Sequence, residues 1–160
     1  MPSDLQLLDV ITPQHVEQLR VIRNDCRLFM TRDRQEISPE QQARWFAALD
    51  HTRVHPYLLS PAETAPQFLG YGLIRRESAT LLLSGGLLEK FRGQGVGAQL
   101  FALLVAEAYA LGGGPIELEV LQSNARARAV YEKLGFQALG REGEDEQERS
   151  NDCDVFGTAA

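Results

Sequence analysis

The sequence predicts a single α/β domain in which helices flank a central mixed, mostly antiparallel sheet. With 160 residues, 44% of them apolar and 24% charged, the chain has the size and apolar content of one globular domain. Stretches with the apolar pattern of strands alternate with stretches of helical periodicity. Three extended stretches also follow one another between residues 56 and 88, which favours antiparallel neighbours.

The first half of the chain begins with a strand over residues 5–11. A threonine and a proline directly after it supply an N-cap and a first-turn residue for a helix over residues 12–24. A serine and a proline give the same start signal for a second helix over residues 38–50. The strands that follow are predicted at residues 56–59, 68–75 and 79–88.

The second half starts with a long helix over residues 96–111, which a run of three glycines and a proline ends. Residues 116–121 form a strand in this prediction, and residues 124–134 form a short helix with one apolar stripe. An extended pattern resumes at residues 136–139. The order of these elements is typical of a sheet covered by helices.

Negative charge is concentrated at the end of the chain. Of the net charge of −6, residues 141–160 contribute −5, with seven acidic residues and two arginines. The remaining body is nearly neutral and has no basic stripe, which argues against nucleic acid as the main partner. We expect this acidic segment to be set apart from a domain over residues 1–140, as an edge strand or a partly mobile tail. Because its negative charge would repel phosphates, it should not be needed for binding a phosphate-bearing ligand.

The composition predicts neither a membrane nor a metal partner. No run approaches the roughly 20 apolar residues that span a bilayer, and the N-terminus has no export signal, so a cytoplasmic location is expected. Cys26 and Cys153 are predicted to be free thiols. The three histidines have no companions at the spacing of metal ligands or of a catalytic triad.

A glycine-rich loop is the most informative segment. Leu87 and Leu88 end an apolar strand, and three alternating glycines then open the long helix. Glycines let anion oxygens approach backbone N–H groups, and a helix start adds unpaired donors. A turn that needs glycine only for its dihedral angles explains the triplet equally well. The predicted phosphate-binding loop consists of Arg92, Gly93, Gln94, Gly95, Val96, Gly97 and Ala98.

The same glycines leave a second interpretation open. Gly93, Gly95 and Ala98 satisfy the dinucleotide-binding fingerprint, and Glu119 lies near the place of a ribose-binding acid. That fingerprint should follow its strand directly, whereas four residues intervene here. Only 63 residues remain after Gly97 to complete a doubly wound sheet. A dinucleotide-binding protein is therefore the weaker alternative.

Two motifs carry a resemblance to a known family. The first is Arg92-x-x-Gly95-x-Gly97, and the second, 27 residues later, is Asn124-x-x-Ala127-x-x-x-Tyr131-Glu132-Lys133-Leu134-Gly135-Phe136. Together they resemble the signature motifs of the GNAT superfamily of N-acetyltransferases. The resemblance implies a GNAT-like fold and acetyl-coenzyme A as co-substrate. It implies that the loop holds the pyrophosphate and that the strand ending at Leu87 and Leu88 pairs with the pantetheine arm.

The resemblance also suggests catalytic residues. The stretch around Glu119 is similar to the family branch that acetylates ribosomal-protein N-termini, which implies that Glu119 is the general base. Asn124 and Tyr131 are two helical turns apart, so Asn124 could contact the pantetheine amide while Tyr131, as general acid, reaches the sulfur. From the residues alone, Glu119 can equally be a solvated acid of a half-exposed strand and Tyr131 a core aromatic.

The predicted function is direct transfer of an acetyl group from acetyl-coenzyme A to a primary amine. A pattern in the N-terminal third resembles GNAT members that act on nucleotide-linked sugars: Arg23-Asn24, Phe29-Met30, Ile37-Ser38 and Trp45-Phe46. The acceptor is thus a protein N-terminus or a small molecule such as an amino sugar. A catalytically silent acetyl-coenzyme A-binding module is the other alternative, and a homodimer is compatible with the sequence.

Overall fold

The structure, a computed structural model, describes residues 4–32, 34–62, 67–140 and 153–158. Its strands are β1 (Leu5–Asp9), β2 (Val54–Pro61), β3 (Gly70–Glu77), β4 (Thr80–Leu87), β5 (Ile116–Leu121), β6 (Phe136–Gly140) and β7 (Cys153–Thr158). Its helices are α1 (Pro13–Asp25), α2 (Pro39–Ala47), α3 (Val96–Ala110) and α4 (Ala125–Lys133), with 3-10 turns η1 (Arg27–Phe29) and η2 (Glu89–Phe91).

The strands form one sheet in the order β1-β2-β3-β4-β5-β7-β6. Every neighbouring pair is antiparallel except β4 and β5, which run parallel. This confirms the mixed, mostly antiparallel sheet and the antiparallel arrangement of β2, β3 and β4. A doubly wound dinucleotide-binding fold requires a mostly parallel sheet, so that alternative is not compatible with this topology.

Strand β7 departs from the expectation for the acidic segment. Residues 153–158 lie between β5 and β6 and pair with both of them, so this part of the chain is neither an edge strand nor a tail. Val155 and Phe156 are 3% and 1% exposed. Burial of these side chains explains why a segment with so many acids upstream still ends inside the sheet. Residues 141–152 lie outside the described part of the chain.

The helix starts follow the predicted caps. The Thr12 hydroxyl accepts from the backbone N–H of His15 at 3.1 Å, and the Ser38 hydroxyl accepts from that of Gln41 at 3.1 Å. Helix α2 ends at Ala47, three residues before the predicted end. The Asp50 carboxylate accepts from both the N–H and the hydroxyl of Thr52, which turns the chain toward β2 instead of continuing the helix.

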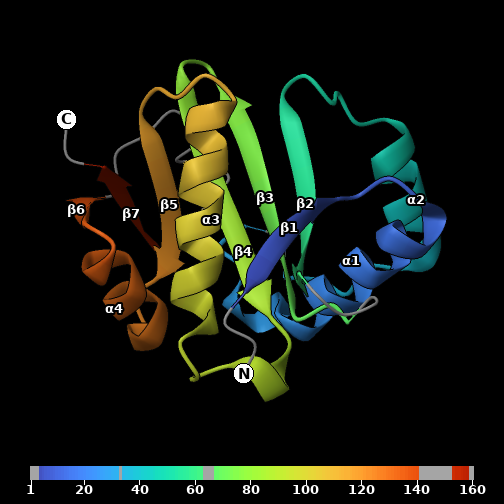
Figure 1. Ribbon diagram of the computed structural model, residues 1–160, viewed down its shortest axis with the longest axis horizontal. Helices are drawn as coiled ribbons and strands as arrows, with labels where there is room; N and C mark the ends of the chain where they lie inside the picture. Colours follow the sequence, from blue (N-terminus) through green and yellow to red (C-terminus); the bar gives the residue numbers. More distant parts are fainter. Residues whose placement is uncertain (1–3, 33, 63–66, 141–152, 159–160) are drawn as a thin grey trace.

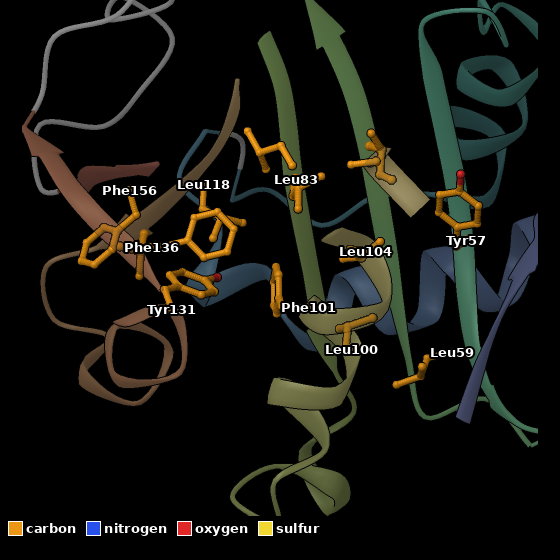
Figure 2. Close-up of a cluster of buried hydrophobic side chains, with 14 of the residues drawn as sticks. Tyr57, Leu59, Leu83, Leu100, Phe101, Leu104, Leu118, Tyr131, Phe136 and Phe156 are labelled. Atoms are coloured by element: carbon orange, nitrogen blue, oxygen red, sulfur yellow. The ribbon is translucent and has the colours of Figure 1, made fainter. Parts of the chain in front are cut away.

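Helices cover both faces of the sheet. Figure 1 shows α3 crossing in front of the central strands, with α4 beside β6 and with α1 and α2 at the other end of the molecule. The larger buried cluster packs beneath α3 and α4, and includes Leu104, Leu118 and Tyr131 (Figure 2). A second cluster lies under α1 and contains Leu19, Ile22 and Leu58. None of the described helices is long and apolar enough to cross a membrane.

Candidate active site

The central strands β4 and β5 separate after a short stretch of pairing. They pair only over residues 81–83 and 116–118, although β4 continues to Leu87 and β5 to Leu121. A cavity of about 580 Å³ opens where the strands part, and residues of η1, α3 and α4 complete its walls. The glycine loop and Glu119 both line this cavity. The structure therefore brings the two sequence-predicted halves of the site together.

Backbone donors of β4 face the gap at alternate residues. The N–H of Leu81 donates to the Pro115 carbonyl on the β5 side at 2.8 Å, whereas the N–H of Leu88 donates to the Leu69 carbonyl on the β3 side at 2.9 Å. Successive peptide groups of a strand point in opposite directions, so the N–H groups of Gly85 and Leu87 point into the gap. Leu88, expected to contribute a donor here, already uses its N–H to hold β3.

The glycine loop has the geometry of an anion cradle. Gly93 and Gly95 adopt the left-handed region, with φ of 75° and 82°, and Gly95 caps α3 without any side chain. The first N–H groups of a helix have no partner within the helix, and the helix dipole adds positive potential there. Gly93, Gly95, Gly97 and Ala98 line the cavity. Their backbone can hold phosphate oxygens.

Two residues of the predicted loop have side chains that lie outside the cavity and stabilise the loop. Val96 is fully buried beneath the loop, where it anchors the start of α3 in the core. The Gln94 amide donates to the Lys90 carbonyl at 2.9 Å and so closes the turn after η2. Neither side chain lines the cavity. Both side chains therefore shape the loop from outside the cavity.

Arg92, predicted to belong to the phosphate-binding loop, is anchored by contacts within the protein. Its Nε donates to the Leu87 carbonyl at 3.0 Å, and its Nη2 donates to the carboxylate of Asp25 at 3.1 Å. The guanidinium also lies over the ring of Phe29, 5.1 Å from the centroid. These contacts tie the end of α1 to the end of β4. Arg92 therefore braces the cavity wall.

Arg126 is the cation beside the glycine loop, and sequence reasoning missed it. Its guanidinium lies where a side chain at Gly93 would contact it, at 3.5 Å. Arg126 is exposed, lines the cavity and forms no ion pair within the described residues. It stands in the first turn of α4, between Asn124 and Ala127 of the second motif. A cation within a recognised motif was the signal available in the sequence.

Helix α4 places Asn124 and Tyr131 on the cavity wall. The Asn124 carboxamide oxygen caps the helix by accepting from the N–H of Ala127 at 3.2 Å. Tyr131 is 6% exposed, and its ring packs edge to face on Phe101, with centroids 5.0 Å apart. Figure 2 shows its hydroxyl end directed toward Phe101. Tyr131 is thus both a core aromatic and a cavity residue.

Burial determines the protonation of the Tyr131 hydroxyl. Loss of hydration, together with the nearby Tyr71 hydroxyl, raises the pKa of Tyr131 well above its ordinary value. The hydroxyl therefore stays protonated throughout the neutral and mildly alkaline range. A protonated hydroxyl on the wall of the cavity can donate a proton but cannot act as a base at neutral pH.

Glu119 is held by charged donors and is not a solvated acid. Its side chain is 9% exposed. Arg32 donates to both carboxylate oxygens, from Nε at 3.0 Å and from Nη2 at 2.9 Å, and the Thr31 hydroxyl donates at 2.9 Å. Arg32 also pairs with Glu77 at 3.2 Å. Although burial opposes it, contact with the two carboxylates raises the pKa of Arg32 above its ordinary value.

The rest of this end of the cavity is largely apolar. Phe29, Met30 and Tyr71 line it, and the Cys26 thiol donates to the Leu87 carbonyl at 3.2 Å. Burial raises the pKa of the Cys26 thiol, although hydrogen bonding to Arg92 opposes this. A protonated, occupied thiol is a poor nucleophile. Within the described residues, no group of three or more His, Cys, Asp or Glu could hold a metal ion.

Comparison with protein families gives one match. The acetyltransferase (GNAT) family matches residues 17–136, which is most of the chain. The match includes both sequence motifs, the strands that separate and the segment that carries Arg32. No curated protein sequence matches the chain.

Solved structures of acetyltransferases have the same fold. A candidate phosphinothricin N-acetyltransferase has a TM-score of 0.77 and 22% identity, covering 97% of this chain and 98% of its own. Spermidine N-acetyltransferase from Vibrio cholerae, solved with CoA and spermine, has a TM-score of 0.74 and 17% identity, covering 97% and 94%. The Salmonella typhimurium enzyme that modifies the N-terminal serine of ribosomal protein L7/L12 has a TM-score of 0.74 and 18% identity. The match covers 99% of this chain and 96% of that enzyme.

Proposed function

The chain belongs to the GNAT acetyltransferase family, and we propose that it transfers an acetyl group directly from acetyl-coenzyme A to a primary amine. One observation carries this proposal: a single cavity joins the glycine loop at the start of α3 to Glu119 and Tyr131. The loop offers backbone donors for phosphates, and the far end offers a carboxylate and a protonated hydroxyl. The V. cholerae relative solved with CoA supports the cofactor assignment.

The cofactor fits the donors that this chain presents. The pyrophosphate would lie on the N–H groups of the glycine loop, with Arg126 as the accompanying cation. The pantetheine arm would extend along the unpaired edge of β4, where Gly85 and Leu87 present N–H groups. The Asn124 carboxamide, which caps α4 through its oxygen, has an amide NH₂ left to contact the arm.

Direct transfer requires stabilisation of the oxyanion, removal of a proton from the amine nitrogen and protonation of the departing thiolate. The amine nitrogen attacks the thioester carbonyl carbon, forming the C–N bond, and the N–H groups facing the β4–β5 gap stabilise the oxyanion. Glu119 accepts the proton that the attacking nitrogen releases. The C–S bond then breaks, and the departing thiolate takes the proton of the Tyr131 hydroxyl. A protonated Cys26 gives no reason to invoke an acetyl-cysteine intermediate.

Turnover and binding assays test this function. Coenzyme A release from acetyl-coenzyme A is measured over a panel of peptide N-termini, amino sugars, amino acids and polyamines. At least one primary amine should give turnover, and Glu119→Gln should lower it by about 10²-fold, within the ~10²–10⁴ range of general acid–base groups. Calorimetry should show nearly unchanged coenzyme A affinity for Glu119→Gln. Binding without turnover on any amine would instead indicate the silent module.

A further inference from the structure

The segment that follows η1 donates hydrogen bonds to the proposed base, Glu119. Thr31 and Arg32 lie 88 and 87 residues before Glu119 in sequence, yet they donate three hydrogen bonds to its carboxylate. Both oxygens are engaged, Oε1 by the hydroxyl and by Nε, and Oε2 by Nη2. Arg32 is 16% exposed and is itself held by Glu77, which Arg75 approaches at 3.7 Å. These contacts form a charged clamp, defined here as Thr31, Arg32 and Glu77 around Glu119.

The clamp engages both oxygens of the Glu119 carboxylate. A carboxylate has about four lone-pair sites, and the three named donors occupy most of them. Paired hydrogen bonds between a guanidinium and a carboxylate are among the strongest in proteins. Stripping a proton from a free ammonium before attack would require this clamp to open. A nitrogen already bonded to the acyl carbon is a much stronger acid, and a clamped carboxylate can accept its proton.

The surroundings of the clamp also disfavour a charged acceptor. Phe29, Met30 and Tyr71 supply apolar surface next to Glu119. Glu119 is the only carboxylate among the described residues that line the cavity, and it is already paired with Arg32. An ammonium entering here would lose hydration without gaining an uncommitted anion among the described residues that line the cavity. The amine therefore enters as the neutral base.

Resting on the proposed function, we infer that Arg32 is a positioning residue for Glu119 and that the acceptor is a primary amine of low basicity. At pH 7.5, roughly a third of an α-amino group with a pKa of ~7.8 is neutral, against roughly 0.1% of a lysine-type amine with a pKa of ~10.4. The concentration of neutral, reactive amine therefore differs by about 260-fold. Peptide α-amino groups and amino sugars share this chemistry, whereas lysine side chains and polyamines do not.

The experiment compares acceptors in the full-length protein. The probes are a short peptide with a free α-amine and no lysine, glucosamine, an N-terminally blocked lysine peptide, and spermidine. At pH 7.5, kcat/KM for the α-amine peptide or for glucosamine should exceed that for the blocked lysine peptide and spermidine by about 10²-fold, following the neutral fractions. The first two probes distinguish a polypeptide acceptor from a sugar. The pH profile should level off above about pH 8 for the α-amine and keep rising toward pH 10 for lysine.

Variants test the role of the clamp. Arg32→Gln removes both charged donors. It should lower the ratio of kcat/KM for the α-amine peptide to kcat/KM for the blocked lysine peptide by about tenfold or more, with unchanged coenzyme A affinity. Thr31→Val removes one hydrogen bond and leaves the Arg32–Glu119 ion pair in place. It should lower the same kcat/KM ratio, and it tests the clamp independently if Arg32→Gln does not fold. Arg27→Gln, an exposed arginine of η1, is the matched control and should behave like the wild type.

The outcomes separate two failures. Equal or better turnover of spermidine or of the blocked lysine peptide by the wild type overturns the inference about basicity. Acceptor ratios and pH profiles in folded Thr31→Val and Arg32→Gln that match the wild type overturn the positioning role. If none of the amines releases coenzyme A, the proposed function itself is wrong.

Discussion

A charge placed at Gly95 should separate an anion cradle from a simple turn. Apart from Gly95 itself and its chain neighbours, no atom of the described residues lies within 4 Å of the position that a Cβ would take at Gly95, so a side chain there meets open space. The residue has φ of 82°, and any L-residue would pay about 1–2 kcal/mol to adopt this conformation. Gly95→Glu and Gly95→Gln share this penalty and nearly the same size. Their difference therefore reports charge alone.

The magnitude follows from Coulomb's law. One carboxylate about 6 Å from one phosphate charge, in an effective dielectric of about 40, is repelled by about 1.4 kcal/mol. The two charges of a pyrophosphate bring this to about 3 kcal/mol, which is roughly a 100-fold loss of affinity at low salt. Screening should shrink the difference between the two variants as ionic strength rises.

Calorimetric titration of coenzyme A into both variants measures this difference. Circular dichroism establishes that each variant is folded, because the strain at residue 95 lowers the stability of both. We expect Gly95→Gln to bind within about tenfold of the wild type and Gly95→Glu to bind about 100-fold more weakly than Gly95→Gln. If two folded variants bind coenzyme A equally well at low salt, phosphate does not lie on this loop and the glycines serve only the turn.

Three further predictions concern the cation, the last strand and the buried tyrosines. Arg126→Gln should weaken coenzyme A binding by about 5- to 20-fold, as expected for one charged hydrogen-bonding partner, in calorimetry where Lys133→Gln at the far end of α4 changes little. Truncation after Gly140 removes β7 from between β5 and β6, so cooperative thermal unfolding should be lost, and a wild-type melting curve would contradict this pairing. Loss of hydration on burial raises the pKa of Tyr131 and raises that of Tyr71 to about 12. Because these folded-state pKa values exceed the unfolded value of ~10, the free energy of unfolding should be constant just below pH 10 and should fall as the pH rises above 10. Urea unfolding at several pH values should show this fall, and the free energy should decrease less steeply with pH in Tyr131→Phe.

The cofactor end of the site could be predicted because its signals are local. The end of β4, the glycine loop and the start of α3 are contiguous in sequence, and the positive φ angles of Gly93 and Gly95 explain why glycine stands at those positions. The direction of Arg92 could not be predicted. It depends on Asp25, 67 residues earlier, which the fold places beside it.

Strand β7 shows where local patterns fail. Residues 141–160 carry most of the net charge, and this charge conceals a short apolar stretch around Val155 and Phe156. Its place between β5 and β6 also requires two strands that follow one another in the chain to lie apart and admit a third strand between them. No periodicity within the segment indicates such an insertion. Composition describes the segment as a whole, whereas β7 depends on the six residues from 153 to 158.

The acceptor end depends on contacts between distant parts of the chain. Thr31 and Arg32 lie in an arginine- and aspartate-rich stretch that is typical of a solvated connection, and Glu119 lies on a strand whose alternation suggests a water-facing acid. Both stretches have the sequence pattern of exposed residues. The side chains of Arg32 and Glu119 nevertheless pair and are largely buried. Because Thr31 and Arg32 lie outside the glycine loop and contact the carboxylate, changes there should alter the choice of amine and leave coenzyme A affinity nearly constant. Changes at Gly95 should do the reverse, so the two ends of one cavity can be assigned to different substrates by separate measurements.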